Sequence, residues 1–452
     1  MFSPPHTPHT PQALNDIAQQ LLGYDPKSLS IDMAREFIAT LCESMASEFF
    51  NRVDAQEMVA MENALGRTLS QDVYSPMNVP AHTNSAMDGY AFRWQDVGST
   101  QHRAPSEFKV VHTVLAGQAW DAALAKDECV KIMTGGVMPI GSDTVAPMEL
   151  VHEITNDRAP FQCVRIDSQL FQAGDNRRLI GEDLREGALA LAKGTRLHSA
   201  SMGLLASLGL SHVRVWRCPK VAIFSTGSEV LALGEPFKHG HVYDANRLSL
   251  TGLLQGLGVE IVDLGVVRDD PQALKDAFLT AKETADIIIT SGGVSVGEAD
   301  YTKAIMKELG DVAFWRIAMR PGRPMAVGRL GQVPLFGLPG NPVAVMVTFL
   351  AFVRPALWRM MGANAADPAV APPLLKARSS QPIRKKPGRT EYQRAIVSTD
   401  DQGQLCVQTT GDQGSGVLSS MVRANGLLVL HHDQGSIAPG DMVDVMVFSG
   451  VL

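Results

Sequence analysis

The sequence has few cysteines and no apolar segment long enough to cross a membrane. Its 452 residues include 5 cysteines, which are scattered, odd in number and form no CxxC pair. This usage argues against a thiolate zinc site and fits a reducing cytoplasm. The longest apolar run, Val343–Val353, is interrupted by Thr348 and closed by Arg354, so it predicts a buried helix rather than a membrane span. We therefore expect a cytoplasmic protein that does not enter a membrane.

The chain also lacks a strong charge of either sign and an apolar N-terminus. A net charge of -7 gives no reason to expect binding to nucleic acid or to an anionic membrane. Any anion must therefore be held by local donors. The first residues, MFSPPHTPHTPQ, contain no apolar stretch, so we expect no secretory signal. Their Pro, His and Thr content predicts a disordered tail over residues 1–27.

What the chain does contain is the composition and length of a soluble protein with several domains. Hydrophobic residues make up 45% and charged residues 19% of the 452 residues, which favours two to four domains. Helical spacing from Ile31 to Leu65 predicts one or two amphipathic helices, and short β runs follow at Phe108–Val114, Cys129–Met133 and Cys163–Ile166. The expected domains are an elongated first domain (28–78 and 173–217), an inserted β domain (79–172), an α/β domain (218–366) and a C-terminal small β barrel or sandwich (372–452).

From Lys220 onward, short apolar strands alternate with helical segments. The candidate strands are Val221–Phe224, Glu260–Val267, Asp286–Thr290, Val312–Ile317 and Val333–Phe336. The candidate helices are Leu248–Leu257, Pro271–Glu283, Thr302–Leu309 and Pro342–Ala356. Such alternation predicts an α/β fold with a central parallel sheet covered by helices on both faces. In these sheets, ligands bind beyond the carboxyl ends of the strands.

Three glycine-bearing loops follow strands of this α/β region. They are Ser225–Glu229, Ser291–Gly297 and Leu338–Pro342. Glycine lets backbone N–H groups approach an anion closely, and a helix N-terminus adds favourable partial charge. Each loop alone also has a structural interpretation, since Asn341 and Pro342 are ordinary helix-start residues. Their repetition at one sheet edge favours a phosphate-rich or oxyanion ligand.

Neither of the two familiar nucleotide-binding motifs is present in these loops. Gly292–Gly297 has the glycine spacing of a Walker motif, but Glu298 stands where the phosphate-binding lysine is needed. The sequence contains no GxGxxG, which disfavours a Rossmann dinucleotide site. Histidines at 239, 241, 431 and 432 lack zinc-site spacing, and we interpret them as non-functional.

Charged residues of both signs accompany the loops. The segment Arg316–Pro324 carries Arg316, Arg320 and Arg323, whose guanidinium groups suit phosphate or an oxyanion, although a solvated surface turn remains the alternative. Carboxylates next to phosphate-binding loops commonly hold Mg²⁺. The nearby acidic residues are Glu229, Asp244, Asp269, Asp270, Glu298 and Asp300.

Two further segments in the expected β domain read locally as tight turns. They are Asn84–Ala91, which carries Asp88, and Ile132–Gly136, which carries Thr134. Taken with the loops above, however, they complete a set of motifs. The others are GEDLREG at 181–187, STGSE at 225–229, YDANR at 243–247, SGGVSVGEADY at 291–301, RPGRP at 320–324, GLPGNPV at 337–343 and GRTEYQRA at 388–395. In this order the set closely resembles the MoeA family, the molybdopterin molybdenumtransferases, whose relatives include the E domain of gephyrin.

The resemblance covers roughly residue 28 to the C-terminus, and it implies an architecture and a reaction. The implied protein is an elongated four-domain homodimer whose active site lies between the α/β domain of one subunit and the inserted β domain of the other. The implied reaction takes molybdate and adenylated molybdopterin to molybdenum cofactor and AMP, with Mg²⁺ or a similar ion present. A molybdopterin adenylyltransferase is the implied upstream partner.

The resemblance and the loop chemistry together give the candidate site residues. The expected catalytic residues are Asp88, Thr134, Glu229, Asp269 and Asp300, of which Glu229, Asp269 and Asp300 are the expected metal ligands. The expected substrate-binding residues are Thr226, Gly227, Ser228, Asn246, Ser291, Gly292, Gly293, Ser295, Gly297, Arg316, Arg320, Arg323, Pro339, Gly340, Asn341 and Pro342.

The sequence also departs from the family pattern and leaves two alternatives open. Ser228 replaces the second acid of the family's STGDE, and Ala344 replaces a serine after NPV, so two polar groups are lost. These departures support a divergent binding or scaffold protein that keeps the fold without turnover. An adenylyltransferase with a related α/β domain is the second alternative, but the inserted β domain and the C-terminal β domain favour the molybdate-inserting enzyme.

Overall fold

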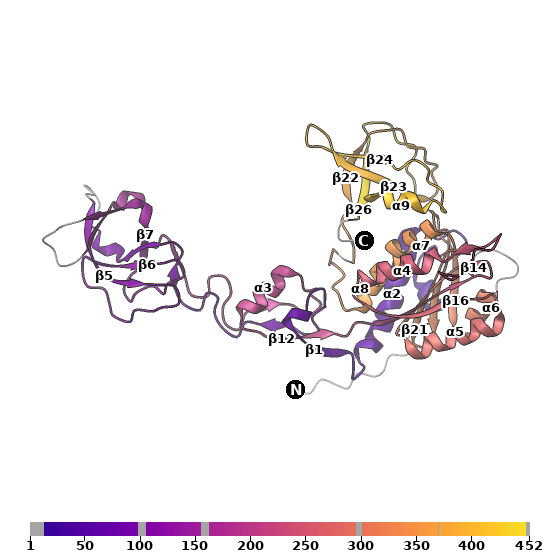
Figure 1. Ribbon diagram of the computed structural model, residues 1–452, viewed down its shortest axis with the longest axis horizontal. Helices are drawn as coiled ribbons and strands as arrows, with labels where there is room; N and C mark the ends of the chain where they lie inside the picture. Colours follow the sequence, from indigo (N-terminus) through magenta and orange to yellow (C-terminus); the bar gives the residue numbers. More distant parts are fainter. Residues whose placement is uncertain (1–12, 98–104, 155–161, 295–300, 369, 449–452) are drawn as a thin grey trace. The chain divides into compact units, whose positions relative to one another are not determined.

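The computed structural model describes residues 13–97, 105–154, 162–294, 301–368 and 370–448. Contacts between Cα atoms divide the chain into two compact units. The first unit contains residues 1–71, 193–198 and 212–452, and the second contains residues 72–192 and 199–211. The α/β domain and a C-terminal β domain both belong to the first unit (Figure 1).

The α/β domain is built on a six-stranded sheet of order β16-β13-β17-β21-β20-β18. These strands are β16 (Glu260–Val267), β13 (Lys220–Thr226), β17 (Ile287–Ser291), β21 (Val333–Leu338), β20 (Pro324–Leu330) and β18 (Asp311–Arg316). The first four run parallel, as the alternating pattern predicts. However, β20 runs antiparallel to both of its neighbours, β21 and β18. The sheet is therefore mixed at one side. No strand was predicted over 324–330.

Helices cover both faces of this sheet, and the strands are buried on both sides. Val221 and Ile223 of β13 pack in a core with α2 (Ile31–Phe50), α4 (Ala245–Gln255) and the segment from α7 (Pro342–Thr348) to α8 (Arg354–Met360). The alternate residues Ala222 and Phe224 pack in a second core with α5 (Pro271–Thr284) and α6 (Tyr301–Leu309). Successive side chains of a strand point to opposite faces, so an apolar run buries both. This confirms the predicted doubly covered sheet.

The predicted buried helix is present and contains a π-helical turn. The segment Pro342–Met360 is long and apolar enough to span a membrane, but 83% of it is buried inside the fold, which is typical of a core helix. Between α7 and α8, Phe349–Val353 form the π turn. Because Pro355 has no N–H, it cannot donate to the carbonyl of Ala351, and Nε of Arg35 donates to that oxygen instead, at 3.3 Å.

The C-terminal domain is a closed barrel of five strands. They are β22 (Leu375–Ser379), β23 (Thr390–Thr399), β24 (Leu405–Thr409), β25 (Gly426–Leu430) and β26 (Met442–Val447). Pairing of β23 with β25 closes the sheet. Of the two predicted folds for this domain, a barrel and a sandwich, the structure therefore shows the barrel. The short strand β19 (Met319–Arg320) of the α/β domain adds to β23 in parallel, so Arg320 lies opposite Glu391. This pairing attaches the barrel to the α/β domain.

Two features of the N-terminal segment differ from the sequence prediction. Residues 14–20 form α1, because Leu14 and Ile17 are buried in the core with α2, so the expected tail over 1–27 is wrong for this part. Residues 1–12 lie outside the described residues. The helical pattern expected up to Leu65 ends at Phe50, and β1 (Gln56–Ala60) follows, paired with β12 (His212–Trp216). A strand was missed here because its partner lies more than a hundred residues away.

The second unit contains a mixed six-stranded sheet of order β7-β4-β6-β5-β9-β8. Its strands are β4 (Gly89–Phe92), β5 (Ser106–Val114), β6 (Glu128–Ile132), β7 (Thr144–Pro147), β8 (Val151–Ile154) and β9 (Cys163–Ile166). The predicted β runs coincide with β5, β6 and β9. The unit also holds the two-stranded pairs of β2 (Val73–Tyr74) with β11 (Leu189–Leu191) and β3 (Asn84–Ser85) with β10 (Arg177–Arg178), and the helix α3 (Ser199–Ser207).

A buried carboxylate fixes the start of the central sheet. The side chain of Asp286 is 8% exposed and accepts from Arg52 at 2.7 Å, from two nitrogens of Arg217 at 3.0 and 3.1 Å, and from the amide of Lys220 at 2.8 Å. Burial alone would raise the pKa of Asp286, but the bonds from Arg217 and Lys220 outweigh it and hold the pKa below its usual value. The carboxylate is therefore charged at neutral pH.

We predict that Asp286→Asn lowers the free energy of unfolding by about 3 kcal/mol, because it removes the buried charge that accepts from Arg217 and Arg52 and leaves them only the exposed Asp54. Urea denaturation followed by circular dichroism measures this. The matched control is Asp54→Asn, whose side chain is 59% exposed beside the same two arginines, and its effect should stay below about 1 kcal/mol. A lowered pKa stabilises the fold above the unfolded-state pKa, so the difference between wild type and variant should persist above about pH 4 and shrink in stronger acid. A pH-independent difference would contradict the assignment.

Candidate active site

A large cavity lies at the carboxyl ends of the parallel strands. Its volume is about 1230 Å³, more than the roughly 300–1000 Å³ of most small-ligand pockets. It is lined by Thr226 and Gly227 after β13, by Ser291–Val294 after β17, and by Pro339–Pro342 after β21. The structure therefore brings the three predicted glycine loops to one cavity. This is the position that the strand order predicts for a ligand.

The backbones of these loops approach one another closely. Gly292 has a φ of +88°, and a Cβ atom there would lie 2.5 Å from the carbonyl oxygen of Thr226. A Cβ on Gly340 would lie 3.9 Å from Cα of Gly292. Asn246 of α4 donates from Nδ2 to the carbonyl of Gly340 at 2.8 Å. Its Oδ1 is buried and has no partner among the described residues, which leaves an acceptor in the cavity wall.

A buried polar network lies beneath the loops. The side chain of Asp244 is 1% exposed, caps α4 by accepting from the amide of Arg247, and accepts from its Nε at 3.0 Å. The hydroxyl of Ser225 donates to Asp244 at 2.9 Å and lies 3.0 Å from the hydroxyl of Ser291. These bonds join the ends of β13 and β17 to the start of α4. Asp244 therefore acts as a support for the loops.

Two of the predicted acidic residues lie near one end of the cavity. Glu229 and Asp269 line it, and both follow the strands β13 and β16 at one side of the sheet. The amide of Ser228 donates to Asp269, and the amide of Asp269 donates to the hydroxyl of Ser228. Asp270 instead caps α5. Within the described residues, which exclude Asp300, no group of three metal-binding side chains is present.

Arginines form the other end of the cavity. Arg320 and Arg323 line it, in the turn between β18 and β20 at the far side of the sheet. Arg389 lines it from the C-terminal barrel, a contribution that the sequence analysis did not predict. The carboxylate of Glu391, 2% exposed, accepts from Nε and Nη2 of Arg389 at 2.9 and 2.8 Å, and lies 3.9 Å from Nη1 of Arg320. Arg316 is exposed and lies outside the cavity lining.

The barrel supplies a further wall of the cavity, which the sequence pattern does not predict. Gln413–Gly416 line the cavity, and the carbonyl of Ser415 accepts from the amide of Val343 at the start of α7. Arg394 is buried beneath this loop and donates to the carbonyls of Asp412 and Gly414 and to the hydroxyl of Ser420. Burial lowers the pKa of Arg394 to about 10, so it remains charged at neutral pH. The closely spaced Gly411, Gly414 and Gly416 were the available sequence signal.

The structure thus gathers most of the candidate residues of the α/β domain in one place. The lining residues among them are Thr226, Gly227, Glu229, Asn246, Asp269, Ser291, Gly292, Gly293, Arg320, Arg323, Pro339, Gly340, Asn341 and Pro342. Ser228 and Arg316 do not line the cavity. Ser295, Gly297 and Asp300 lie outside the described residues. Ala344, the position where a serine was expected, does line the cavity.

Asp88 and Thr134 belong to the second unit and form a pair of their own. One oxygen of Asp88 accepts from the amide of Thr134 at 2.7 Å and from its hydroxyl at 2.8 Å. These bonds, the amide first, hold the pKa of the exposed Asp88 carboxyl below its usual value. Gly89 is required next to it, because a Cβ there would lie 2.1 Å from the carbonyl oxygen of Ala146. The turn presents an ionised carboxylate at the surface of the unit.

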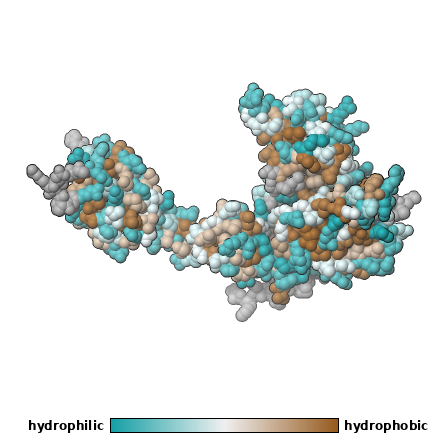
Figure 2. Space-filling view, in the orientation of Figure 1, coloured by the Kyte–Doolittle hydropathy of each residue, from teal (hydrophilic) through white to brown (hydrophobic). Residues whose placement is uncertain are grey.

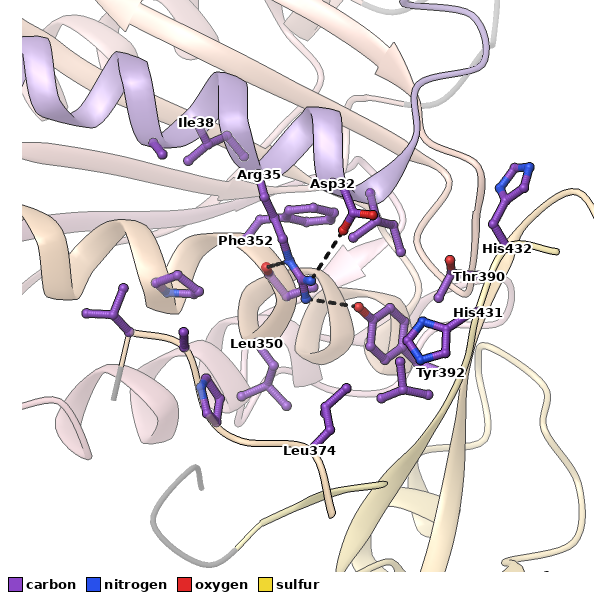
Figure 3. Close-up of a pocket in the computed structure, with 18 of the residues that line it drawn as sticks. Asp32, Arg35, Ile38, Leu350, Phe352, Leu374, Thr390, Tyr392, His431 and His432 are labelled. Atoms are coloured by element: carbon purple, nitrogen blue, oxygen red, sulfur yellow. Dashed lines mark hydrogen bonds and ion pairs between the residues drawn. The ribbon is translucent and has the colours of Figure 1, made fainter. Parts of the chain in front are cut away.

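A smaller cavity of about 520 Å³ lies between α2, α8 and the barrel (Figure 3). Its charged groups are partnered within the protein. Arg35 contacts Asp32 and donates to Tyr392, and Arg359 pairs with Glu43. His431 and His432 lie near Asp444 and Asp433, respectively. Because these charges are already balanced, the larger cavity is the better candidate for an anionic ligand.

Comparisons with family models cover nearly the whole chain. Residues 29–209 match the MoeA N-terminal region (domain I and II). Residues 222–359 match the probable molybdopterin binding domain, and residues 376–448 match the MoeA C-terminal region (domain IV). The inserted β unit, the α/β domain and the C-terminal barrel therefore all match domains of one family.

Similar proteins of known name support the same assignment. The chain is 37% identical to the molybdopterin molybdenumtransferase of Haemophilus influenzae, over 88% of this chain and 95% of that protein. It is 34% identical to the enzyme of the same name from a Nostoc species, over 97% and 96%. A crystal structure of the molybdopterin biosynthesis MoeA protein from Pyrococcus horikoshii superposes with a TM-score of 0.68 at 30% identity, covering 93% of this chain and 99% of that one. The chain belongs to the MoeA family.

We predict that Gly292→Ala destabilises the protein by about 2–5 kcal/mol, because it adds both an unfavourable φ and a clash with the backbone of Thr226. The matched control is Gly258→Ala, where φ is +73° but no atom lies within 4 Å of the added Cβ. The control carries only the conformational cost, on the order of 1 kcal/mol. Urea denaturation compares the two variants. Equal losses of stability would show that the two loops do not depend on this contact.

Proposed function

We propose that this chain is a molybdopterin molybdenumtransferase that inserts molybdate into adenylated molybdopterin and releases AMP during molybdenum cofactor biosynthesis. The observation that carries the proposal is the cavity at the sheet edge, which combines three glycine loops with arginines from two domains. Backbone amides and guanidinium groups are the donors that phosphates and other oxyanions prefer. The names of the relatives, which share more than a third of their residues with this chain in two cases, point to the same reaction.

The cavity suits a long, anionic ligand with different groups at its two ends. From β16 to β18 the sheet spans five strand spacings, on the order of 20 Å. Carboxylates lie near the β16 end and arginines near the β18 end. We assign the glycine loops to the phosphates of the adenylated substrate and the arginines to the oxyanion. The free Oδ1 of Asn246 suits an N–H or O–H donor of the ligand.

Glu229 and Asp269 have the oxygen donors that Mg²⁺ requires, and both line the cavity. They are the residues that would hold the ion, together with Asp300. When bound, Mg²⁺ supplies neutralisation of phosphate charge and polarises a phosphoryl oxygen. The residues of the chain do the remaining work: the glycine-loop amides orient the phosphoanhydride, and the arginines hold the oxyanion near it.

The proposal includes a homodimer in which Asp88 and Thr134 of one subunit complete the cavity of the other. The segment from β14 (Val230–Leu231) to β15 (Val242–Tyr243) exposes Leu233, Phe237 and Val242, of which Val242 also lines the cavity. These exposed apolar side chains support self-association. Hydrophobic side chains also gather on the visible face of the α/β domain (Figure 2). A cytoplasmic molybdopterin adenylyltransferase would supply the adenylated substrate.

We predict that purified protein releases AMP from adenylated molybdopterin when molybdate and Mg²⁺ are present. Glu229→Gln should slow this release on the order of 100-fold, because it removes a charged oxygen ligand at the phosphate end. The matched control is Glu36→Gln, an exposed carboxylate of α2 that does not line the cavity and should leave the rate unchanged. Chromatographic quantification of AMP provides the measurement. Tight binding without AMP release would favour a scaffold, and consumption of ATP with free molybdopterin would favour an adenylyltransferase.

Mixing two inactive variants tests whether residues of two subunits form one active site. Asp88→Asn and Glu229→Gln variants should each be nearly inactive alone. If each site combines Asp88 of one chain with Glu229 of the other, half of the dimers formed by random mixing have one intact site. Activity should then recover to about a quarter of the wild-type value. Absence of recovery after confirmed subunit exchange would mean that both residues act within one chain.

A further inference from the structure

Glu391 is a buried carboxylate that contacts both arginines of the cavity wall but does not itself line the cavity. Its two oxygens have separate partners. Oε1 accepts from Nε and Nη2 of Arg389, and Oε2 accepts from Nε2 of Gln393 at 3.0 Å and faces Nη1 of Arg320. A buried, ionised carboxylate is stable only with such compensation. Its position behind the arginines makes it a support rather than a ligand contact.

The two arginines come from different domains and would repel each other without this carboxylate. Arg320 belongs to β19 of the α/β domain, whereas Arg389 directly precedes β23 of the barrel. The parallel pairing of β19 with β23 places Arg320 opposite Glu391. Burial lowers the pKa of Arg394, the nearby Asp412 carboxylate partly opposes this, and the positive charge of Arg320 lowers the pKa further, so Arg394 and Arg320 lie near each other. Glu391 is the carboxylate that lies within 4 Å of both Arg320 and Arg389.

The strand that carries Glu391 is itself anchored from its other side. Tyr392 is buried and accepts from Nη2 of Arg35 at 3.1 Å, while Nε of the same arginine donates to the carbonyl of Ala351 (Figure 3). Arg35 belongs to α2, and Ala351 belongs to the π turn between α7 and α8. Adjacent residues of a strand point to opposite sides. The helices of the α/β domain thus hold β23 from behind while Glu391 holds the arginines in front.

We propose that Glu391 is a positioning residue for oxyanion recognition. Glu391 accepts from Nε and Nη2 of Arg389 and faces Nη1 of Arg320, so it restricts the orientation of both guanidinium groups. Their remaining N–H groups can then donate to a ligand in the cavity. Glu391 sets how tightly the oxyanion substrate binds and leaves the bond-breaking step to other residues. This inference rests on the proposed function for the identity of the oxyanion, which is molybdate.

The test uses Glu391→Gln and Glu391→Asp in the full-length protein, with molybdate as the titrant in isothermal calorimetry and as the varied substrate in the AMP-release assay. Glu391→Gln should raise the dissociation constant and the KM for molybdate about tenfold, the effect of losing a charge-assisted hydrogen bond, while kcat changes less than threefold. Glu391→Asp keeps the charge and should restore part of the affinity. The matched control is Asp444→Asn, which removes a carboxylate of the same barrel, 13% exposed and paired with Lys376 and His431, and should leave KM unchanged.

The background variant Arg320→Ala/Arg389→Ala tests whether Glu391 acts through the arginines. In that background, adding Glu391→Gln should leave the molybdate dissociation constant unchanged. Three outcomes would overturn the proposal: tighter molybdate binding by Glu391→Gln, which would mean that the carboxylate only opposes the anion by its charge; unchanged binding; or a fall in kcat and stability alone, which would mean a merely structural role. If wild-type protein releases no AMP, the proposed function fails, but the titrations still decide the role of Glu391.

Discussion

The close approach of backbone turns at the ends of three parallel strands is the constraint on which the cavity depends. The register pairs Ser225 with Ser291 and Ser291 with Leu338, so the three strands end at the same level. Any chain leaving them must turn in the same small volume. Gly292 has no Cβ and therefore lets its turn contact the backbone of Thr226. Asp244 then supports two of the strand ends from below, because it accepts from the hydroxyl of Ser225, which in turn lies 3.0 Å from the hydroxyl of Ser291.

The position of these loops could be predicted from the sequence because it follows from local pattern. Alternating strands and helices imply a parallel sheet, and a parallel sheet has all its carboxyl ends at one edge. The prediction failed where pairing is decided by a distant partner. The strand β20 follows an Arg/Pro turn and runs antiparallel to β21, which its own apolar residues do not reveal. Likewise, β1 continues the apolar spacing of α2 but pairs with β12, so periodicity alone extended the helix too far.

Local pattern also made part of the candidate site predictable, and pairing with distant segments again explains the residues that were missed. Residues that directly follow parallel strands were found, whereas Arg389 and Gln413–Gly416 reach the cavity only because the barrel closes and then pairs with β19. Arg316 was included because it lies in the same basic segment as Arg320. It belongs to the end of β18, however, and the chain turns between the two positions, so only Arg320 and Arg323 line the cavity.

The order of strands also explains how a protein with a net charge of -7 has a basic wall at one end of its cavity. Acidic residues follow β13 and β16, and the arginines follow β18, so the two signs are separated by the width of the sheet. At physiological salt the screening length is about 8 Å, shorter than that separation, so the carboxylates cancel little of the field at the arginines. The buried carboxylate of Glu391 then offsets one positive charge of the arginine cluster, and the net charge of the cavity wall there stays positive. The end of the cavity near β18 is therefore basic, which the overall composition does not predict.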